Sequence, residues 1–236
     1  MVLFKYKVDP ADGQAKIKVA LSASPSISLS DPAAELHLTL KINIESSVKE
    51  GQPITFMVKN TVFDVKEDGD GGLDMFSRLA FSGLRSTSQD STKDISLGAF
   101  RVNERWKSES PDWRERGCRF ITVPGNGLCV TVTHRLDWTR IFQFERKRTK
   151  DDLIPGERFE IRMGKGNLGC MWWCWGDLES DLKDKRLHVW CPDPFSGEKP
   201  DEDFVREGNW VLGEEPMRLE WVVDTGDERA MFEIVD

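Results

Sequence analysis

The stretch that decides the fold is Leu36-His37-Leu38-Thr39-Leu40-Lys41-Ile42-Asn43-Ile44, in which every second residue is apolar. Successive side chains of a β-strand point to opposite faces, so this stretch places an aliphatic row on one face and a polar row on the other. A strand of this kind is half buried, with one face against a core and the other in water, as in an antiparallel sheet.

The same period of two recurs along the chain, in residues 17–23, 54–58, 128–134, 158–163, 217–223 and 230–235. Turn-forming residues separate these segments, among them Asp31-Pro32 and Ile154-Pro155-Gly156. Repeated short strands with turn signals between them are typical of a sandwich or a barrel. We therefore expect an all-β protein with an immunoglobulin-like antiparallel β-sandwich.

One turn carries a more specific prediction. Pro124-Gly125-Asn126-Gly127 stands between the strand segments 118–123 and 128–134. Its Asn-Gly pair tolerates the positive φ values that tight hairpin turns require. The sequence therefore predicts a hairpin in which these two strands pair.

The domain organisation is simple. The sequence shows neither an internal repeat nor a clean interdomain linker, so we expect a single β-sandwich domain over residues 1–236. Residues 177–215 interrupt the strand pattern with prolines and charges, and Leu178 and Leu182 share one face of a short helical pattern. This segment is predicted to be a long, irregular and partly helical insertion.

Charge and cysteine content limit the partners and the compartment. The formal net charge is −8, which a nucleic acid or an anionic membrane would repel, so neither is an expected partner. No apolar run approaches the roughly 20 residues that span a bilayer, and residues 1–8 lack the apolar block of a signal peptide. The five cysteines are an odd number in a long chain, unlike a disulfide framework. These features predict a cytoplasmic protein and leave its oligomeric state open.

The most informative segment contains three of the nine tryptophans, Trp172, Trp173 and Trp175. Read as a strand, it places Leu168, Cys170, Trp172 and Cys174 on one face and Met171, Trp173 and Trp175 on the other. Both faces are apolar, so one belongs to the sandwich core and the other needs a cover.

Two covers are open for that second face. The first is internal, because the insertion brings Trp190, Phe195, Phe204 and Trp210. The second is a ligand or a partner, because aromatic-lined concavities are typical of sites for apolar molecules. In the second case the candidate ligand-binding residues are Met171, Trp173, Trp175, Trp190 and Trp210.

A metal site is a minor alternative. Cys170, Cys174, His188 and Cys191 offer the four thiolate or imidazole ligands of a tetrahedral zinc site. However, the first two are strand positions flanked by tryptophan, and free cysteine is among the most commonly buried residues. We therefore expect no metal and no other cofactor.

Catalytic candidates are few because the chain has only three histidines. His134 ends an apolar row and stands close in sequence to Asp137, and His188 lies between Leu187 and Trp190. Each is a candidate for proton transfer, or a histidine satisfied by the core. The sequence contains no G-x-S-x-G elbow, Walker loop or H-E-x-x-H motif.

Parts of the chain resemble a known group of proteins. The residues that carry the resemblance are the serine-rich stretch 21–30, then 36–44 with Pro53-Ile54-Thr55-Phe56, and finally 153–159 leading into Trp172-Trp173-Cys174-Trp175-Gly176. They resemble a set of uncharacterised filamentous-fungal proteins with short, serine-rich paired strands. The resemblance implies a β-sandwich and a fungal origin, and it supplies no catalytic residue.

Two functions follow as hypotheses. In the first, which we favour because the sequence holds no catalytic motif, the protein is a non-catalytic binding protein. It would hold a protein partner or a small apolar molecule on a tryptophan-rich surface or pocket. In the second, it is a cyclase or isomerase of fungal specialised metabolism, with an aromatic pocket and a His/Asp pair that transfers protons.

Overall fold

Strands dominate the structure. The computed structural model describes residues 12–65, 73–88, 90–100, 108–164 and 166–236. In these ranges the two α-helices, α1 (Trp138–Phe142) and α2 (Glu202–Glu207), are short. The prediction of an all-β sandwich is confirmed. Residues 1–8, which entered the prediction of a cytoplasmic protein, lie outside the described residues.

The first sheet has the strand order β12-β1-β3-β7. Its strands are β1 (Ala15–Ala23), β3 (Glu35–Ser47), β7 (Val130–Asp137) and β12 (Leu219–Val222). β3 is antiparallel to both neighbours, with Leu40 opposite Leu21 of β1 and Leu38 opposite His134 of β7. Buried side chains alternate with exposed or half-buried ones along β1 and most of β3, as the period of two predicts.

The second sheet has the order β2-β13-β8-β5. Its strands are β2 (Ser26–Ser28), β5 (Arg85–Ser86), β8 (Arg158–Arg162) and β13 (Arg229–Val235). One edge strand of each large sheet is parallel to its neighbour, namely β12 beside β1 and β2 beside β13. These parallel edges are additions to the antiparallel pattern that the sequence predicts.

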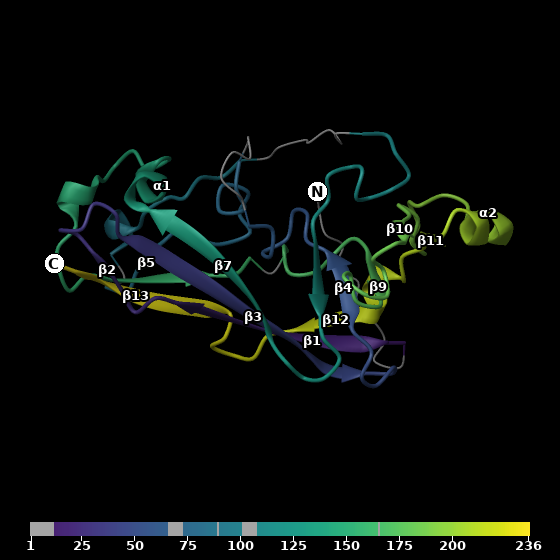
Figure 1. Ribbon diagram of the computed structural model, residues 1–236. Coiled ribbons are helices and arrows are strands. Elements are labelled where there is room, and N and C mark those ends of the chain that lie inside the picture. The colour runs from purple at the N-terminus through teal and green to yellow at the C-terminus, as the bar shows by residue number, and fades with distance from the viewer. Residues whose placement is uncertain (1–11, 66–72, 89, 101–107, 165) are drawn as a thin grey trace.

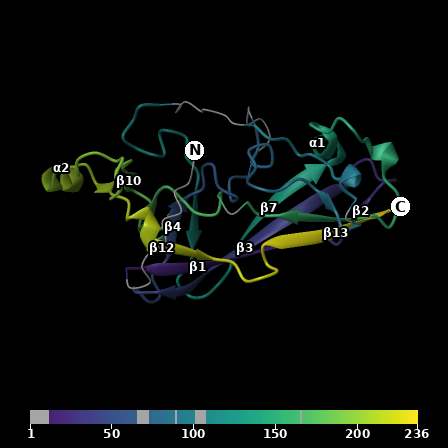
Figure 2. The ribbon, with the colours of Figure 1, turned by 180° about the vertical axis from the view of Figure 1, so that it is seen from behind.

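The two large sheets share one hydrophobic core. Val19 and Leu40 of the first sheet belong to the same buried cluster as Phe159 and Phe232 of the second, and these two phenylalanine rings stack with centroids 5.8 Å apart. Figures 1 and 2 place the C-terminus at one end of the molecule and α2 at the other.

The third sheet has the order β6-β4-β9, with β4 (Ile54–Met57) between β6 (Phe120–Val123) and β9 (Trp173–Trp175). All four residues of β4 are buried. This differs from the half-buried strands of the first sheet, because Ile54 and Phe56 enter the main core and Met57 enters a second cluster. The other buried members of this second cluster are Trp113, Cys118, Trp172, Cys174, Leu182, Leu187 and Cys191.

The predicted hairpin after residue 123 is wrong in its pairing. The turn exists, and Gly127 has the positive φ of 80° that favours glycine. However, β6 pairs with β4 in the third sheet, whereas β7 pairs with β3 in the first. The turn therefore carries the chain from one sheet to another. Gly125 lies against the backbone of Gly51 and leaves no room for a Cβ.

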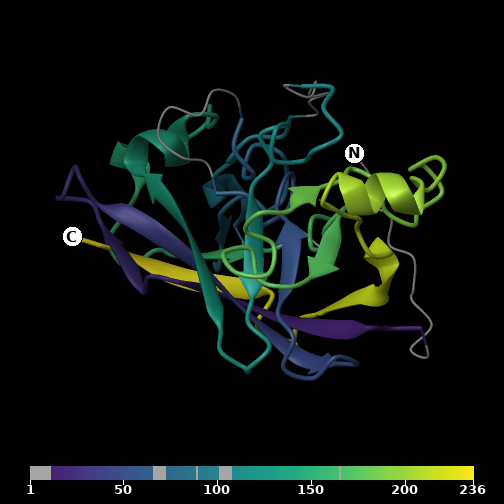
Figure 3. The ribbon, with the colours of Figure 1, turned by 45° about the vertical axis from the view of Figure 1, so that its right-hand side comes forward.

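Residues 177–215 form the predicted irregular insertion, called here the late lobe. It contains a two-stranded parallel sheet, β10 (Arg186–Leu187) and β11 (Trp210–Val211), and α2 between them in sequence. Asp201 caps α2 by accepting hydrogen bonds from the backbone N–H groups of Asp203 and Phe204. Figure 3 shows α2 outside the sheets.

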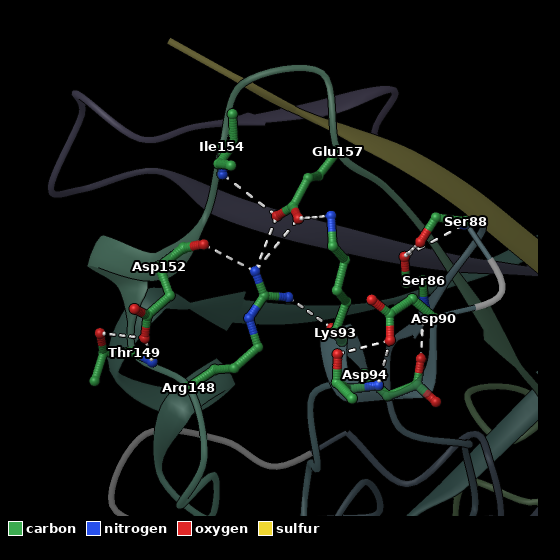
Figure 4. A network of polar contacts seen from close by, with 11 residues as sticks. Ser86, Ser88, Asp90, Lys93, Asp94, Arg148, Thr149, Asp152, Ile154 and Glu157 are labelled. Carbon is green, nitrogen blue, oxygen red and sulfur yellow. Dashed lines mark hydrogen bonds and ion pairs between the residues drawn. The ribbon is translucent and has the colours of Figure 1, made fainter.

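The remaining helical turns are three 3-10 segments within the described ranges, η1 (Ser91–Lys93), η2 (Lys150–Asp152) and η3 (Pro216–Arg218). A clamp joins η1 to the loop before β8. Arg148 donates to the carbonyl oxygens of Lys93 and Asp152, at 2.7 and 2.9 Å, and pairs with Glu157 at 3.1 Å. Lys93 Nζ reaches the same carboxylate at 3.2 Å. Figure 4 shows Arg148 between Glu157 and Asp152.

Candidate functional site

The tryptophan-rich strand lies between two cores. Trp173 and Trp175 belong to the main core, and Trp172 and Cys174 belong to the second cluster. The predicted division of this segment into two faces is thus correct for these four residues. Trp172 and Trp173 are both 0% exposed.

The burial of these rings favours the internal cover over the pocket or partner surface that the sequence also left open. The indole N–H of Trp173 donates to the carbonyl oxygen of Glu215 at 3.0 Å, and its ring meets that of Trp175 edge-on at 5.3 Å. Trp175 is buried as well, and Met171 is half-buried beside the second cluster. Trp173 is 0% exposed and Trp175 9% exposed, and both rings belong to the packed main core.

The internal cover is the alternative that the structure supports, although other residues supply it. The second cluster closes over Trp172 with Leu182, Leu187 and Cys191 of the late lobe. Trp113 joins them from a part of the chain that the sequence pattern did not connect with this strand. Phe195 and Phe204, which were expected to form the cover, are 72% and 48% exposed.

The four zinc candidates do not form a ligand set. Cys170 lies in the main core, whereas Cys174 and Cys191 lie in the second cluster. His188 Nδ1 accepts a hydrogen bond from the backbone N–H of Trp190 at 3.0 Å. Across the described ranges, no three His, Cys, Asp or Glu side chains are grouped so that they could hold a metal ion.

The buried thiols have the properties of core residues. Burial raises the pKa of the Cys174 thiol to about 12. Burial also raises the pKa of Cys191 to about 12, and its sulfur lies 3.1 Å from the carboxylate of Asp193. A neutral thiol is a poor nucleophile, so neither cysteine is activated for attack.

His134 is a satisfied core histidine. Its Nε2 lies 2.7 Å from the carbonyl oxygen of Val62, and the rings of Phe76 and Phe81 each meet the imidazole edge-on at 5.2 Å. Burial lowers the pKa of His134 more than the hydrogen bond to Val62 and the nearby Asp74 raise it. The neutral imidazole therefore donates from Nε2.

The predicted proton-transfer pair is absent at this place. Asp137 is three residues after His134 on β7, so its side chain points to the opposite face and is exposed while the imidazole is buried. Asp137 instead caps α1 by accepting a hydrogen bond from the backbone N–H of Arg140 at 2.6 Å.

His188 and Trp210 meet in the late lobe. Their rings contact edge-on, with centroids 5.1 Å apart. The Arg186 guanidinium lies over the Trp210 ring at 3.8 Å, and Phe204 stacks on that ring with an interplanar angle of 17°. Burial and the guanidinium groups of Arg116 and Arg186 lower the pKa of His188, although Asp112 opposes them.

A hollow of about 310 Å³ opens at the surface of this lobe, next to Trp210. Its polar lining consists of Lys185, Lys199, Glu202, Arg206 and Asn209. Its apolar lining consists of Pro200, Val205, Trp210 and Leu212. We call it the Trp210 hollow. Of the five predicted ligand-binding residues, Trp210 lines the hollow. Trp190 is half-buried and donates its indole N–H to the carbonyl oxygen of Gly197.

The sequence prediction missed the polar lining of the hollow. Lys185, Lys199, Arg206 and Asn209 are spread over 25 residues of the chain and form no motif. The one local signal is the Gly208-Asn209 pair before Trp210, because Asn209 takes the positive φ of 53° that such pairs accommodate. That turn brings Asn209 and Trp210 to the same opening.

No protein-family model matches the sequence, and no curated protein matches it. The resemblance to filamentous-fungal proteins therefore stays a prediction. In the described part of the chain, no helix has the length and apolar composition that crossing a membrane requires.

Proposed function

We propose that this chain is a non-catalytic binding protein whose recognition site is the Trp210 hollow. The observation that carries the proposal is the gathering of polar side chains of both charges at a surface concavity whose lining also includes Trp210. Sites for small molecules are typically concave, with aromatic and aliphatic walls and a few polar groups that orient the ligand. The volume of about 310 Å³ is at the small end of that range and suits a ligand of fragment size.

The lobe holds the tryptophan in place before any ligand arrives. Arg186 and Phe204 contact the ring, and His188 meets its edge. His188 is itself fixed by the hydrogen bond from the Trp190 amide. A site with its aromatic wall already in position loses less conformational entropy on binding.

The enzyme hypothesis has less support. It needs a histidine and a carboxylate that share a proton beside an open aromatic pocket. His134 is enclosed by Phe76, Phe81 and the Val62 carbonyl, and Asp137 lies on the other face of β7. Among the described residues that line the Trp210 hollow there is no histidine, so they form no His/Asp pair there.

A fragment screen by NMR tests the proposal. The indole N–H signal of Trp210 is assigned by its loss in the Trp210→Phe variant, and that of Trp173 by its loss in Trp173→Phe. We expect fragments with an aromatic ring and one polar group to shift the Trp210 signal in a saturable way, with the Trp173 signal unchanged. If no fragment shifts Trp210, or if all hits act on the core tryptophans, the hollow is not the recognition site.

A further inference from the structure

Some of the charged side chains that line the Trp210 hollow form ion pairs with other described residues, and others do not. Lys185 Nζ donates a hydrogen bond to the side-chain oxygen of Asn209 at 2.6 Å. This oxygen is a neutral acceptor. Within the described ranges, neither Lys185 nor Lys199 takes part in an ion pair. Arg206 pairs with Asp203 one helical turn earlier. The lining therefore carries two ammonium groups without a carboxylate partner against one carboxylate, Glu202.

Lys185 is held toward the opening by its neighbours. Asn209 donates its side-chain N–H to the carbonyl oxygen of Asp184 at 2.6 Å, and its backbone carbonyl accepts the N–H of Arg186 at 3.1 Å. The amide is thus fixed at both ends, and it fixes the ammonium group in turn. An ammonium group has three N–H donors, so Lys185 keeps donors for a ligand after its bond to Asn209.

The aromatic wall beside these cations is tightly supported. Gly208 lies against Cδ1 and Nε1 of Trp210 so closely that a Cβ there would overlap the ring. Val205 and Leu212 continue the apolar wall. The hollow therefore combines a rigid apolar side with two cations that have no anionic partner among the described residues.

We infer that the ligand of the Trp210 hollow is a small molecule with an apolar body and a single anionic group, a carboxylate or a phosphate. This inference rests on the proposed function and adds the chemical class of the ligand. An anionic group would be attracted by both Lys185 and Lys199, whereas a cationic group would be attracted by Glu202 alone. The groups are exposed, so each contact is weak and sensitive to salt.

Three matched probes test the inference by the shift of the Trp210 indole signal, namely phenylacetate, phenylacetamide and phenethylamine. They share one ring and differ in charge. We expect phenylacetate to bind about fivefold more tightly than the amide and the amine to bind most weakly. Benzyl phosphate in place of phenylacetate distinguishes phosphate from carboxylate, and a preference for either anion over the amide supports the inference.

Two charge reversals provide the matched comparison. Lys199→Glu changes a lining residue, whereas Lys147→Glu changes an exposed lysine outside the lobe. Both alter the net charge equally, so long-range repulsion changes equally. We expect Lys199→Glu to remove the preference for the anion and Lys147→Glu to retain it. Equal binding of the amide and the anion would overturn the ligand class and leave the proposed function standing. If none of the probes shifts Trp210, the proposed function fails as well.

Discussion

Trp172 and Trp173 are adjacent in sequence, and their indoles lie in different hydrophobic clusters. The tryptophan-rich segment therefore separates the main core from the second cluster, which lies under the late lobe. Because both faces of this segment are buried, it stabilises the fold, and recognition is assigned to the hollow at the surface of the late lobe, whose lining includes Trp210, itself 7% exposed.

The buried position of Trp173 leads to a prediction about stability. Trp173→Ala removes a fully buried ring and its hydrogen bond to Glu215, so the free energy of unfolding should fall by about 3–5 kcal/mol. Trp190→Ala, at a half-buried position, should cost less than about 2 kcal/mol. Urea denaturation followed by circular dichroism measures both. Equal, small losses would place Trp173 outside the core.

Gly213 allows the late lobe to pack closely against Trp172. A Cβ at this position would lie 2.5 Å from Cδ1 and Nε1 of Trp172 and 2.9 Å from Cβ of Cys191. Gly213→Ala should therefore lower the free energy of unfolding by about 1–3 kcal/mol. Gly166→Ala is the control, because a Cβ there meets nothing within 4 Å. Thermal unfolding of the two variants should separate them, and unchanged stability of Gly213→Ala would show that the lobe does not pack against Trp172 in this way.

The buried His134 makes stability depend on pH. Its pKa in the folded protein lies below the ordinary value of 6.5, so the unfolded chain binds the proton more readily. The free energy of unfolding should therefore fall as the pH decreases below about 6.5. His134→Leu should remove this part of the pH dependence, although it leaves the Val62 carbonyl without its donor. Denaturation at several pH values gives the free energy of unfolding of both proteins. The same pH dependence in both would contradict a lowered pKa of His134 in the folded protein.

The clamp in Figure 4 predicts a second, more acidic dependence. Burial alone would raise the pKa of Glu157, but hydrogen bonds from Lys93, Ile154 and Arg148 outweigh it and the pKa lies below the ordinary value of 4.5. The clamp should thus stabilise the protein above that pH and weaken as the pH falls below it.

A substitution in the clamp tests its contribution at neutral pH. The side chains of Arg148 and Glu157 are each only 10% exposed, so Glu157→Gln leaves a largely buried guanidinium without its anion. We expect a loss of about 2 kcal/mol. Glu233→Gln is the control, because its partner Arg158 is 67% exposed and such pairs contribute less than about 1 kcal/mol. If both variants lose the same free energy, the clamp has no special role.

The features that depend on neighbouring residues in one strand could be predicted from the sequence, whereas those that depend on distant residues could not. The alternation of residues 36–44 depends on the geometry of a single strand, and it identified the buried row of β3 except at its end, where Ile44 is half-buried. The pairing of β6 and β7 depends on partners elsewhere in the chain, so a good turn signal at Asn126-Gly127 led to the wrong pairing. The Trp210 hollow depends on contacts among residues 185–212, which no periodicity describes.

A single titration distinguishes recognition at Trp210 from recognition at Trp173. Phenylacetate is added to the protein while the indole N–H signals of both tryptophans are followed by NMR. We predict a saturable shift of the Trp210 signal, a weakening of phenylacetate binding in the Lys199→Glu variant to the level of phenylacetamide, and a constant Trp173 signal. A shift of the Trp173 signal with the Trp210 signal unchanged would place recognition at Trp173.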